Sequence, residues 1–280
     1  MQAAHAASRT PLWSSLYTHI EKWIVPFLVL GGWEIFSRSG VLPQALLPAP
    51  SQVLVAWADW VFETDGNSQM YSGKWLSDIL ASATRVFSGF LIAALIGIAA
   101  GIAIGWSKTV EKLFEPTLQT LRPIPPVAWI PLAIIWFGIA NKPAIFLVFM
   151  GSFFPILLST IHGVKTCDRN LLRAGAMCGG SSRMLLRHIV FPAALPSIFS
   201  GLRIAIGSAW MLSVTAEMVA VKSGVGYVLW DSYYFLRYDI VIAAMCSIGL
   251  MGFFSDALIK KLFARLLRWQ HATTLQSKKD

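Results

Sequence analysis

The sequence predicts an all-α integral membrane protein with about six transmembrane helices. Two observations predict this fold class: 56% of the 280 residues are apolar, and only 13% are charged. A typical soluble domain carries about 25% charged residues, so most of this chain must lie in a medium that does not require charge. The mean hydropathy of +0.62 indicates that the medium is a lipid bilayer. The composition excludes a disordered chain, a small disulfide scaffold and a typical soluble enzyme.

Six segments are apolar enough to span a hydrocarbon core about 30 Å thick, which takes roughly 20 helical residues. They are 20–36, 86–106, 118–139, 143–161, 197–221 and 240–258. The third segment is interrupted by four prolines. Broken backbone is tolerated at membrane depth only where protein shields it or where it lines a cavity. We therefore expect this segment to border a translocation path, or else to be a merely kinked helix.

The distribution of basic residues predicts that both termini are cytoplasmic. With that orientation the inner segments contain 16 Lys and Arg, whereas the outer segments contain 5, against 6 Asp and Glu. Such an excess of Lys and Arg is typical of cytoplasmic loops. The net charge of +9 therefore follows from membrane topology, and no known nucleic-acid-binding module accompanies it. The apolar stretch 24–32 favours a retained first span over a cleaved signal peptide.

The chain is predicted to have three parts. Residues 1–76 contain the first transmembrane helix and an outer helix that begins at Pro50, with Ser51 as its N-cap. This outer helix either lies at the membrane–water interface or packs as a solvated helix on the spans. Residues 77–264 form the transmembrane domain, and residues 265–280 form a basic cytoplasmic tail.

Small residues in the second span predict close helix packing. Gly97, Gly101 and Gly105 are four residues apart, so they form a ridge of bare backbone on one helix face. Contact between subunits and a mobile seam are the alternatives to packing within the chain.

Five charged residues lie within or at the ends of the spans. Arg85, Arg203 and Asp256 are close enough to span ends that we expect each to reach water by snorkelling. Glu217 and Glu34 lie near the outer ends of their spans. Charged residues inside a membrane are functional candidates, and we expect these two to organise an outer gate rather than to bind solute.

The sequence contains no motif for catalysis. It lacks a nucleotide-binding loop, a zinc-protease motif and a nucleophile elbow. Its five histidines and three cysteines lack metal-ligand spacing, so no catalytic residue, metal site or cofactor is predicted in this chain. Residues 224–226, Gly-Val-Gly, are too short for a dinucleotide fingerprint and are predicted to form a turn.

The inner segment 165–195 carries the most specific pattern. It predicts a short helix that ends at Gly179-Gly180 and a cap at Ser181-Ser182. A second amphipathic helix follows and is predicted to stop at Pro192 and Pro196. Two short helices with basic residues, projecting from a membrane domain, make a docking surface for a partner protein.

This segment resembles the cytoplasmic loop of permease subunits of bacterial binding-protein-dependent ABC importers. The loop motif of that family is E-A-A, three residues, G, nine residues, I-x-L-P. The spacing from the glycine onward is met without a gap, whereas an arginine reverses the charge of the usual glutamate. The corresponding residues are Arg173, Ala174, Gly175, Gly179, Ile189, Phe191 and Pro192.

The resemblance covers nearly the whole chain and is most specific from 77 to 264. Segments 47–51, 122–129, 201–203 and 216–218 are similar to the branch that imports nitrate, taurine, alkanesulfonates and bicarbonate. The resemblance implies a type I ABC importer permease fold in the bacterial inner membrane. The solute is then small and anionic.

The resemblance also implies partners. These are cytoplasmic ABC ATPase subunits that bind ATP and Mg²⁺, a second permease copy in a homodimer, an extracytoplasmic substrate-binding protein and membrane lipid, but no nucleic acid. Residues 171–192, here called the coupling loop, would contact the ATPase. The solute path is expected near Trp129, Ser152, Ser208 and Ser213, with Glu217 at the gate.

Two other classes remain as alternatives. A stand-alone channel or secondary transporter would need no ATPase and leaves the loop motif unexplained. An integral-membrane enzyme requires paired carboxylates, a metal cluster or an activated nucleophile, and the sequence shows none of these patterns.

Overall fold

The computed structural model describes residues 12–43, 45–63 and 70–266, and the side chains of residues 24–43, 45–63 and 70–264. All regular elements in these residues are helices. In chain order they are α1 (Leu12–Arg38), α2 (Pro50–Phe62), α3 (Trp75–Trp106), α4 (Lys108–Leu121), the 3-10 helix η1 (Pro126–Trp129), α5 (Ile130–Phe137), α6 (Asn141–Lys165), α7 (Arg169–Met177), α8 (Ser182–Leu185), the π-helix η2 (Leu186–Val190), α9 (Phe191–Ala220), α10 (Val225–Tyr234) and α11 (Tyr238–Leu266).

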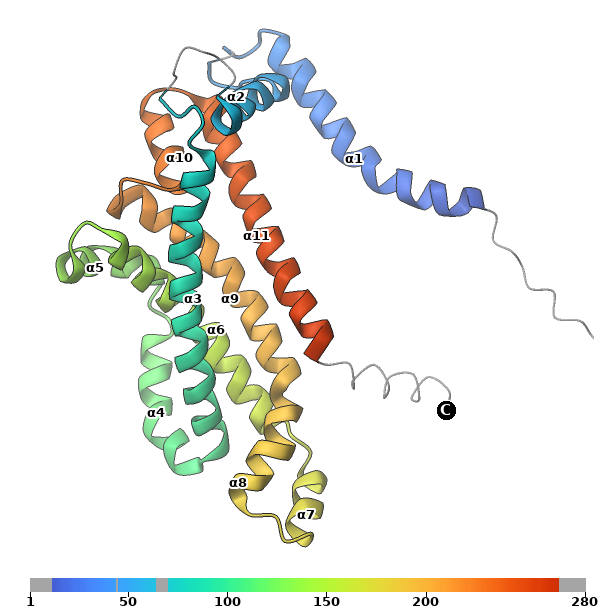
Figure 1. The fold of residues 1–280 in the computed structure, drawn as a ribbon, viewed down its shortest axis with the longest axis vertical. Coiled ribbons are helices and arrows are strands. Elements are labelled where there is room, and N and C mark those ends of the chain that lie inside the picture. The colour runs from blue at the N-terminus through green and yellow to red at the C-terminus, as the bar shows by residue number, and fades with distance from the viewer. Residues whose placement is uncertain (1–11, 44, 64–69, 267–280) are drawn as a thin grey trace, which may run out of the picture.

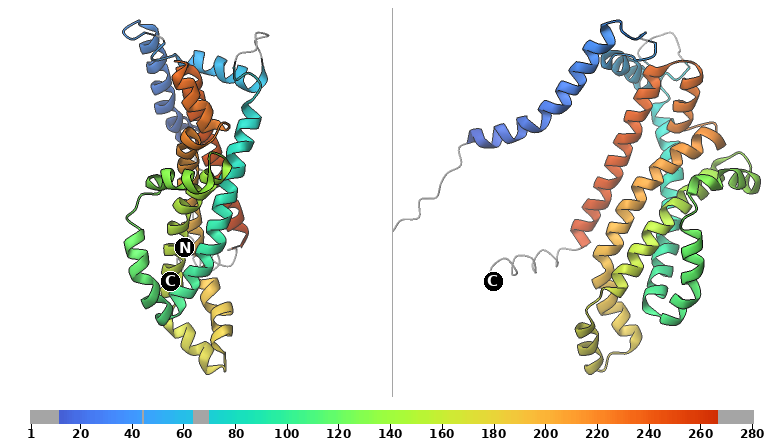
Figure 2. Two further views of the ribbon diagram at one scale, coloured as in Figure 1. Left: turned by 90° about the vertical axis from the view of Figure 1, so that its left-hand side faces the viewer. Right: turned by 180° about the vertical axis from the view of Figure 1, so that it is seen from behind.

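The long helices form an elongated bundle (Figure 1). At its centre α6 packs against both α3 and α9, and α11 lies beside α9 and α10. Helices α2 and α10 cover one end of the bundle, here called the α10 end, and α7 and α8 form the opposite end, the α7 end. Helix α1 packs against α2 and otherwise points away from the bundle, as Figure 1 and the right-hand view of Figure 2 show.

Among the residues that the structure describes, four helices are long and apolar enough to cross a membrane, and they match four of the predicted spans: Trp75–Trp106, Asn141–Lys165, Ser182–Ala220 and Tyr238–Ala264. The third predicted segment is long and apolar enough to span a membrane only if two helices, Lys108–Leu121 and Pro126–Phe137, are taken together. These two helices are bent by 85° relative to each other. The prediction that the prolines break this segment is confirmed. The first predicted span lies in α1, whose side chains are described only from Ile24. The count of six spans therefore stays a prediction.

The outward faces of these helices suit lipid. Large apolar side chains lie exposed along the bundle, among them Leu95, Met211 and Phe253, on α3, α9 and α11. A helix satisfies its backbone hydrogen bonds internally, so such faces can contact hydrocarbon directly. The buried side chains gather instead between α3, α6 and α9, where Val86, Ile156 and Ala205 share one apolar core.

The glycine ridge on α3 faces α6, as the small-residue spacing predicts. A Cβ atom on Gly101 would lie 2.6 Å from Cβ of Thr160, and one on Gly105 would lie 2.8 Å from Cβ of Val164. Real Cβ atoms do not approach so closely, so only glycine allows this separation of the two helices. The ridge thus serves packing within the chain.

The helix predicted to begin at Pro50 is confirmed as α2, but its predicted cap is wrong. Ala49 is the N-cap residue. Ser51 instead donates from its backbone N (3.1 Å) and its Oγ (2.8 Å) to the carboxylate of Glu34, and so ties α2 to α1. Trp60 is fully buried, which shows that α2 packs on the bundle. The predicted tail, 265–280, lies outside the described residues apart from the last turn of α11.

Candidate functional site

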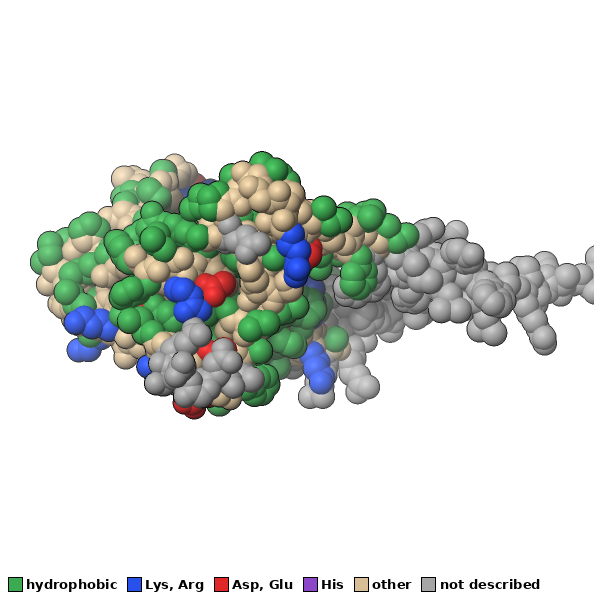
Figure 3. Space-filling model, turned by 90° about the horizontal axis from the view of Figure 1, so that it is seen from above, with side chains coloured by type: hydrophobic (Ala, Val, Ile, Leu, Met, Phe, Trp, Pro, Cys, Tyr) green, Lys and Arg blue, Asp and Glu red, His purple; other side chains and the backbone are tan. Residues whose placement is uncertain are grey.

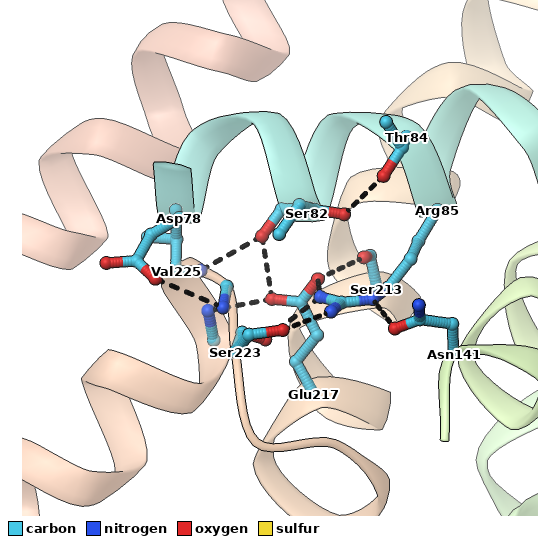
Figure 4. Close-up of polar contacts among 12 residues, drawn as sticks. Asp78, Ser82, Thr84, Arg85, Asn141, Ser213, Glu217, Ser223 and Val225 are labelled. Carbon is cyan, nitrogen blue, oxygen red and sulfur yellow. Dashed lines mark hydrogen bonds and ion pairs between the residues drawn. The ribbon is translucent and has the colours of Figure 1, made fainter. Parts of the chain in front are cut away.

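A buried ion pair joins α3 to α9 at the α10 end (Figure 4). Arg85 Nη1 lies 2.8 Å from Glu217 Oε1, and the two side chains are 3% and 0% exposed. Burial costs each ion several kcal/mol of hydration free energy. This cost is offset only if the remaining donors and acceptors of the pair also find partners. The other hydrogen bonds of the two groups therefore decide whether the pair is stable.

Glu217 accepts hydrogen bonds at both carboxylate oxygens. Ser82 Oγ donates to Oε2 (2.8 Å) and Ser213 Oγ donates to Oε1 (3.1 Å). The backbone N–H of Gly226, in the first turn of α10, donates to Oε2 (2.9 Å). The first N–H groups of a helix have no partner within it and carry partial positive charge, so they favour an anion there.

Arg85 uses its remaining donors to connect three further segments. Its Nε donates to Asn141 Oδ1 (2.9 Å), at the first residue of α6. Its Nη1 donates to the backbone O of Ser223 (2.9 Å), and its Nη2 donates to the Oγ of Ser223 (2.6 Å). The prediction that Arg85 snorkels to water is wrong, because every nitrogen of its guanidinium group binds inside the protein. One side chain thus fastens α3, α6, α9 and the turn before α10 together.

Gly224 lies directly on the ion pair. Its φ of 104° and ψ of 169° belong to a region that is essentially restricted to glycine. A Cβ atom there would lie 2.6 Å from both Arg85 Nη1 and Glu217 Oε2. The predicted turn at 224–226 is confirmed, and its geometry directs the N–H of Gly226 at Glu217.

Gly224→Ala is expected to lower the free energy of unfolding by about 1–3 kcal/mol from backbone strain alone, with a further loss from displacing the ion pair. Gly138→Ala is the matched control. Gly138 has a similar backbone conformation, with φ of 74° and ψ of −178°, but a Cβ there meets no atom within 4 Å. Thermal unfolding of the two purified variants in detergent measures the difference. Equal destabilisation would mean that contact with the ion pair is unimportant.

Further polar contacts surround this cluster at the α10 end. Asp78 accepts from Trp60 Nε1 (3.3 Å) and from the backbone N of Gly224 (3.4 Å). The Tyr71 hydroxyl donates to Asp231 Oδ2 (2.7 Å), and burial raises the pKa of Tyr71, so that the phenol keeps the proton that it donates. Seen from above, this end shows basic and acidic side chains interspersed among hydrophobic ones (Figure 3).

The side chains predicted to line a solute path are only partly brought together. Ser213 touches Glu217 and is fully buried, as is Ser152, whose Oγ donates to the backbone O of Ala205 (3.4 Å). Ser208 Oγ donates to the backbone O of Gly151 (3.1 Å). Trp129 lies in an aromatic group, with its ring centroid 6.5 Å from that of Trp136. The role of these four side chains in a solute path stays a prediction.

At the α7 end, the glycine pair of the coupling loop terminates α7 as predicted. The N–H of Gly180 donates to the O of Gly175 (3.1 Å) and the N–H of Gly179 donates to the O of Ala176 (3.0 Å). This is the Schellman pattern, and it places Gly179 at a φ of 80°. Ser181 caps the next helix, since its Oγ accepts a hydrogen bond from the N–H of Met184 (3.4 Å).

The prediction that the second loop helix stops at Pro192 and Pro196 is wrong. Helix α8 continues through the π-helical turn η2 into α9, so that Ser182–Ala220 is one span. The N–H of Phe191 donates to the O of Leu186, one residue further back than in an α-helix. Pro192 directly follows this π-helical turn and lies inside the continuous helix, where it leaves one backbone hydrogen bond unmade.

The motif residues of the coupling loop divide into two groups. Gly175 is packed, because a Cβ there would lie 2.6 Å from Ile189 Cδ1 and from Leu185 Cδ2. Together with Gly179 it fixes how α7 crosses the second helix. Arg173 and Ala174 are exposed, and Phe191 is 39% exposed. The second group is therefore available to a partner protein.

Two structural details escaped the sequence prediction. Arg203 and Asp256 were each expected to snorkel, and their side chains are 45% and 28% exposed, but their contact with each other, 2.8 Å from Arg203 Nε to Asp256 Oδ1, was not predicted. Glu34 binds Ser51 and Arg38 and so joins α1 to α2. In the described part of the chain, no three His, Cys, Asp or Glu side chains are grouped closely enough to hold a metal ion.

Comparison with known proteins places this geometry in context. Residues 93–268 match the family described as the inner membrane component of binding-protein-dependent transport systems. The chain is 32% identical over 242 residues to the taurine transport system permease protein of Escherichia coli, covering 86% of each chain. It is 34% identical over 257 residues to the bicarbonate transport system permease protein of Synechococcus elongatus, covering 88% of this chain and 86% of that relative.

A solved structure shares the fold. It is an inward-facing conformation of the methionine ABC transporter MetNI, with a TM-score of 0.55 and 16% sequence identity, covering 66% of this chain and 94% of that chain.

Proposed function

Because the chain belongs to the family of inner membrane components of binding-protein-dependent transport systems, we propose that it forms the solute path of an ATP-driven importer for a small anion. The chain is an ABC transporter permease and a multi-pass protein of the inner membrane. It resembles transport permeases rather than enzymes, and the proposal assigns ATP and Mg²⁺ to a separate ATPase.

The observation that carries the proposal is the coupling loop. It includes the short helices α7 and α8 that form the α7 end (Figure 1), and its side chains Arg173, Met177 and Phe191 are exposed. Met177 is 87% exposed and Arg173 on the same helix is exposed too, so α7 offers both an apolar and a basic side chain to a partner protein. We assign the α7 end to the cytoplasm and this surface to the ATPase, as the excess of basic residues on inner segments supports.

The cluster around Arg85 and Glu217 is then proposed as the outer gate. It lies at the α10 end, which would face the extracytoplasmic binding protein, and it fastens four segments of the chain to one another. Alternating access requires such segments to separate and rejoin as the ATPase closes and opens. A second copy of the chain would complete the path as a homodimer.

The proposed solute is an anion of the sulfonate, nitrate or bicarbonate type. The similarity to permeases named for taurine and for bicarbonate supports this class. At the α10 end acidic and basic side chains are interspersed, so this face offers no strong field to select an anion (Figure 3). Selection is therefore assigned to the binding protein.

The Gly179→Asp variant is expected to reach the membrane but to lose most of its bound ATPase. Aspartate at a φ of 80° strains the end of α7 and adds a negative charge to the docking face. Gly40→Asp is the control, because Gly40 also has a positive φ of 75° with open space at its Cβ, but lies near α1. Pull-down of each tagged variant and quantification of ATPase subunits measures the effect. An undiminished ATPase yield with Gly179→Asp would contradict the docking assignment.

The proposed function itself is tested by purifying the tagged permease from native membranes. We expect an ATPase subunit to copurify in equal proportion, and we expect its activity to rise when the binding protein is added together with taurine, nitrate or bicarbonate. A permease that purifies alone and still transports in liposomes would instead be a channel or a secondary transporter.

A further inference from the structure

A hollow of about 490 Å³ lies between α9 and α11, away from both the ion pair of Arg85 and the coupling loop. Its volume falls within the range of about 300–1,000 Å³ that is typical of small-ligand sites. Its lining includes Arg203, Ile206, Gly207, Trp210, Gly252 and Asp256.

One end of the hollow is charged. Arg203 donates to Asp256 from Nε to Oδ1 (2.8 Å) and from Nη2 to Oδ2 (3.3 Å), and Lys260 Nζ lies 2.8 Å from the same Oδ2. Two cations thus share one anion, which leaves a net charge of +1. The Arg203 and Lys260 side chains are 45% and 54% exposed, so their remaining N–H groups are accessible.

The other end of the hollow is apolar, and its floor is formed by two glycines that leave the space above them empty. Gly207 and Gly252 each lie four residues, or one helical turn, from Arg203 and Asp256 in the direction of the α10 end. A Cβ atom on either glycine would meet no atom within 4 Å. Trp210 and Ile206 are buried behind this floor. The site therefore changes from cationic to apolar over about one turn of helix.

The depth of the charged end matches a membrane interface. Asp256 lies about 27 Å along α11 from Tyr238, at a rise of about 1.5 Å per residue, and a hydrocarbon core is about 30 Å thick. With Tyr238 at one interface, Asp256 lies close to the opposite one and Gly252 lies within the hydrocarbon. A phospholipid has the same order of groups, with phosphate at the interface and acyl chains inward.

We propose that this hollow binds one anionic phospholipid of the leaflet at the α7 end. Its phosphate binds Arg203 and Lys260, and one of its acyl chains lies over Gly207 and Gly252. Asp256 holds the two cations side by side. A helix of a second copy fits less well, because covering this end would bury a net positive charge, whereas a phosphate neutralises it. The site is independent of the solute and of the ATPase.

The test is photolabelling of the full-length protein in vesicles of phosphatidylcholine with a small fraction of phosphatidylglycerol that carries a diazirine in one acyl chain. We expect label on the peptides that contain Gly207 and Gly252, and we expect Gly252→Leu, which fills the floor, to reduce it at least fivefold. Gly249→Leu is the matched control on the same helix, because its Cβ also faces open space but Gly249 does not line the hollow.

Variants of the charged end test the headgroup. Arg203→Gln is expected to weaken competition by unlabelled phosphatidylglycerol about fivefold, the effect of one basic residue near an anionic headgroup. Asp256→Asn is expected to strengthen competition by unlabelled phosphatidylglycerol, because the net charge of the group formed by Arg203, Lys260 and residue 256 rises from +1 to +2. Three outcomes would each overturn the proposal. They are label distributed evenly over the exposed faces, equal labelling of the two leucine variants, and protection of the hollow by a cross-linked second copy.

Discussion

Replacing Arg85 with methionine is expected to lower the free energy of unfolding by about 3–5 kcal/mol, because Glu217 then stays buried without its counter-ion. Glu217 is 0% exposed, so water cannot replace the lost cation. Its hydrogen bonds from Ser82, Ser213 and Gly226 remain, but these donors carry no full charge. The measurement is the fraction of monodisperse protein that survives heating in detergent.

Arg38→Met is the control for this prediction. Arg38 also binds a glutamate, Glu34, but its side chain is 64% exposed, and exposed ion pairs contribute little. We expect no measurable loss of stability. If Arg85→Met and Arg38→Met unfold at the same temperature, the buried pair does not hold the α10 end together.

A double variant separates stability from gating. Arg85→Met combined with Glu217→Leu removes both charges, and buried ion pairs replaced by apolar residues are often as stable as the original. We expect the double variant to recover most of the lost stability but not solute-coupled transport, since a gate that must open and close depends on a pair that can separate. Full transport by the double variant would exclude the ion pair from the gate.

The second large effect is expected at Gly101. Gly101→Leu would force α3 and α6 apart, because even a Cβ atom there lies 2.6 Å from Thr160 Cβ and 3.0 Å from the O of Leu157. Overpacking of a buried contact costs about 1–3 kcal/mol and sometimes more, and here backbone is part of the obstacle. We expect almost no folded protein in detergent extracts. Fluorescence-detected size-exclusion chromatography measures the yield.

Two comparisons make the prediction at Gly101 specific. Gly249→Leu introduces the same side chain into a long helix at a position with open space, and we expect a normal yield. Gly101→Ala combined with Thr160→Gly removes the side chain that the new methyl group would meet, so it should be more stable than Gly101→Ala alone. If the added Thr160→Gly change brings no recovery, the α3–α6 contact is not what limits folding.

The elements that depend on local pattern could be predicted from the sequence. The spacing of Gly97, Gly101 and Gly105 predicted a close helix contact because the spacing itself defines a helix face. The glycine pair Gly179-Gly180 predicted the end of α7 because few other residues adopt a positive φ. In both cases the physical cause lies within a few residues of the signal.

The ion pairs could not be predicted, because their partners are far apart in the chain. Arg85 and Glu217 are separated by 132 positions, and Arg203 and Asp256 by 53. Each charge taken alone lies near a span end, where snorkelling is the ordinary outcome. Only the packing of α3, α9 and α11 shows that they meet, and a single sequence contains no measure of that packing.

The continuation of the second loop helix past Pro192 has the same explanation. Proline usually marks a helix boundary, so the sequence predicts a stop. The structure overrides it, because Val190 and Ala194 are fully buried with Ile198 against the end of α6. Burial of that face stabilises a continuous helix more than the missing hydrogen bond destabilises it.

The continuity of Ser182–Ala220 also has a mechanical consequence. Helices bend most easily at prolines and π-turns, and both weak points, Pro196 and Leu186–Val190, lie near the coupling loop. Beyond them about 30 Å of unbroken helix extends to Glu217. A rotation of about 5° at Pro196 would therefore move Glu217 by about 2.6 Å, enough to break hydrogen bonds that hold only to about 3.2 Å. A small angular displacement beside the loop is thus amplified with distance along a rigid arm.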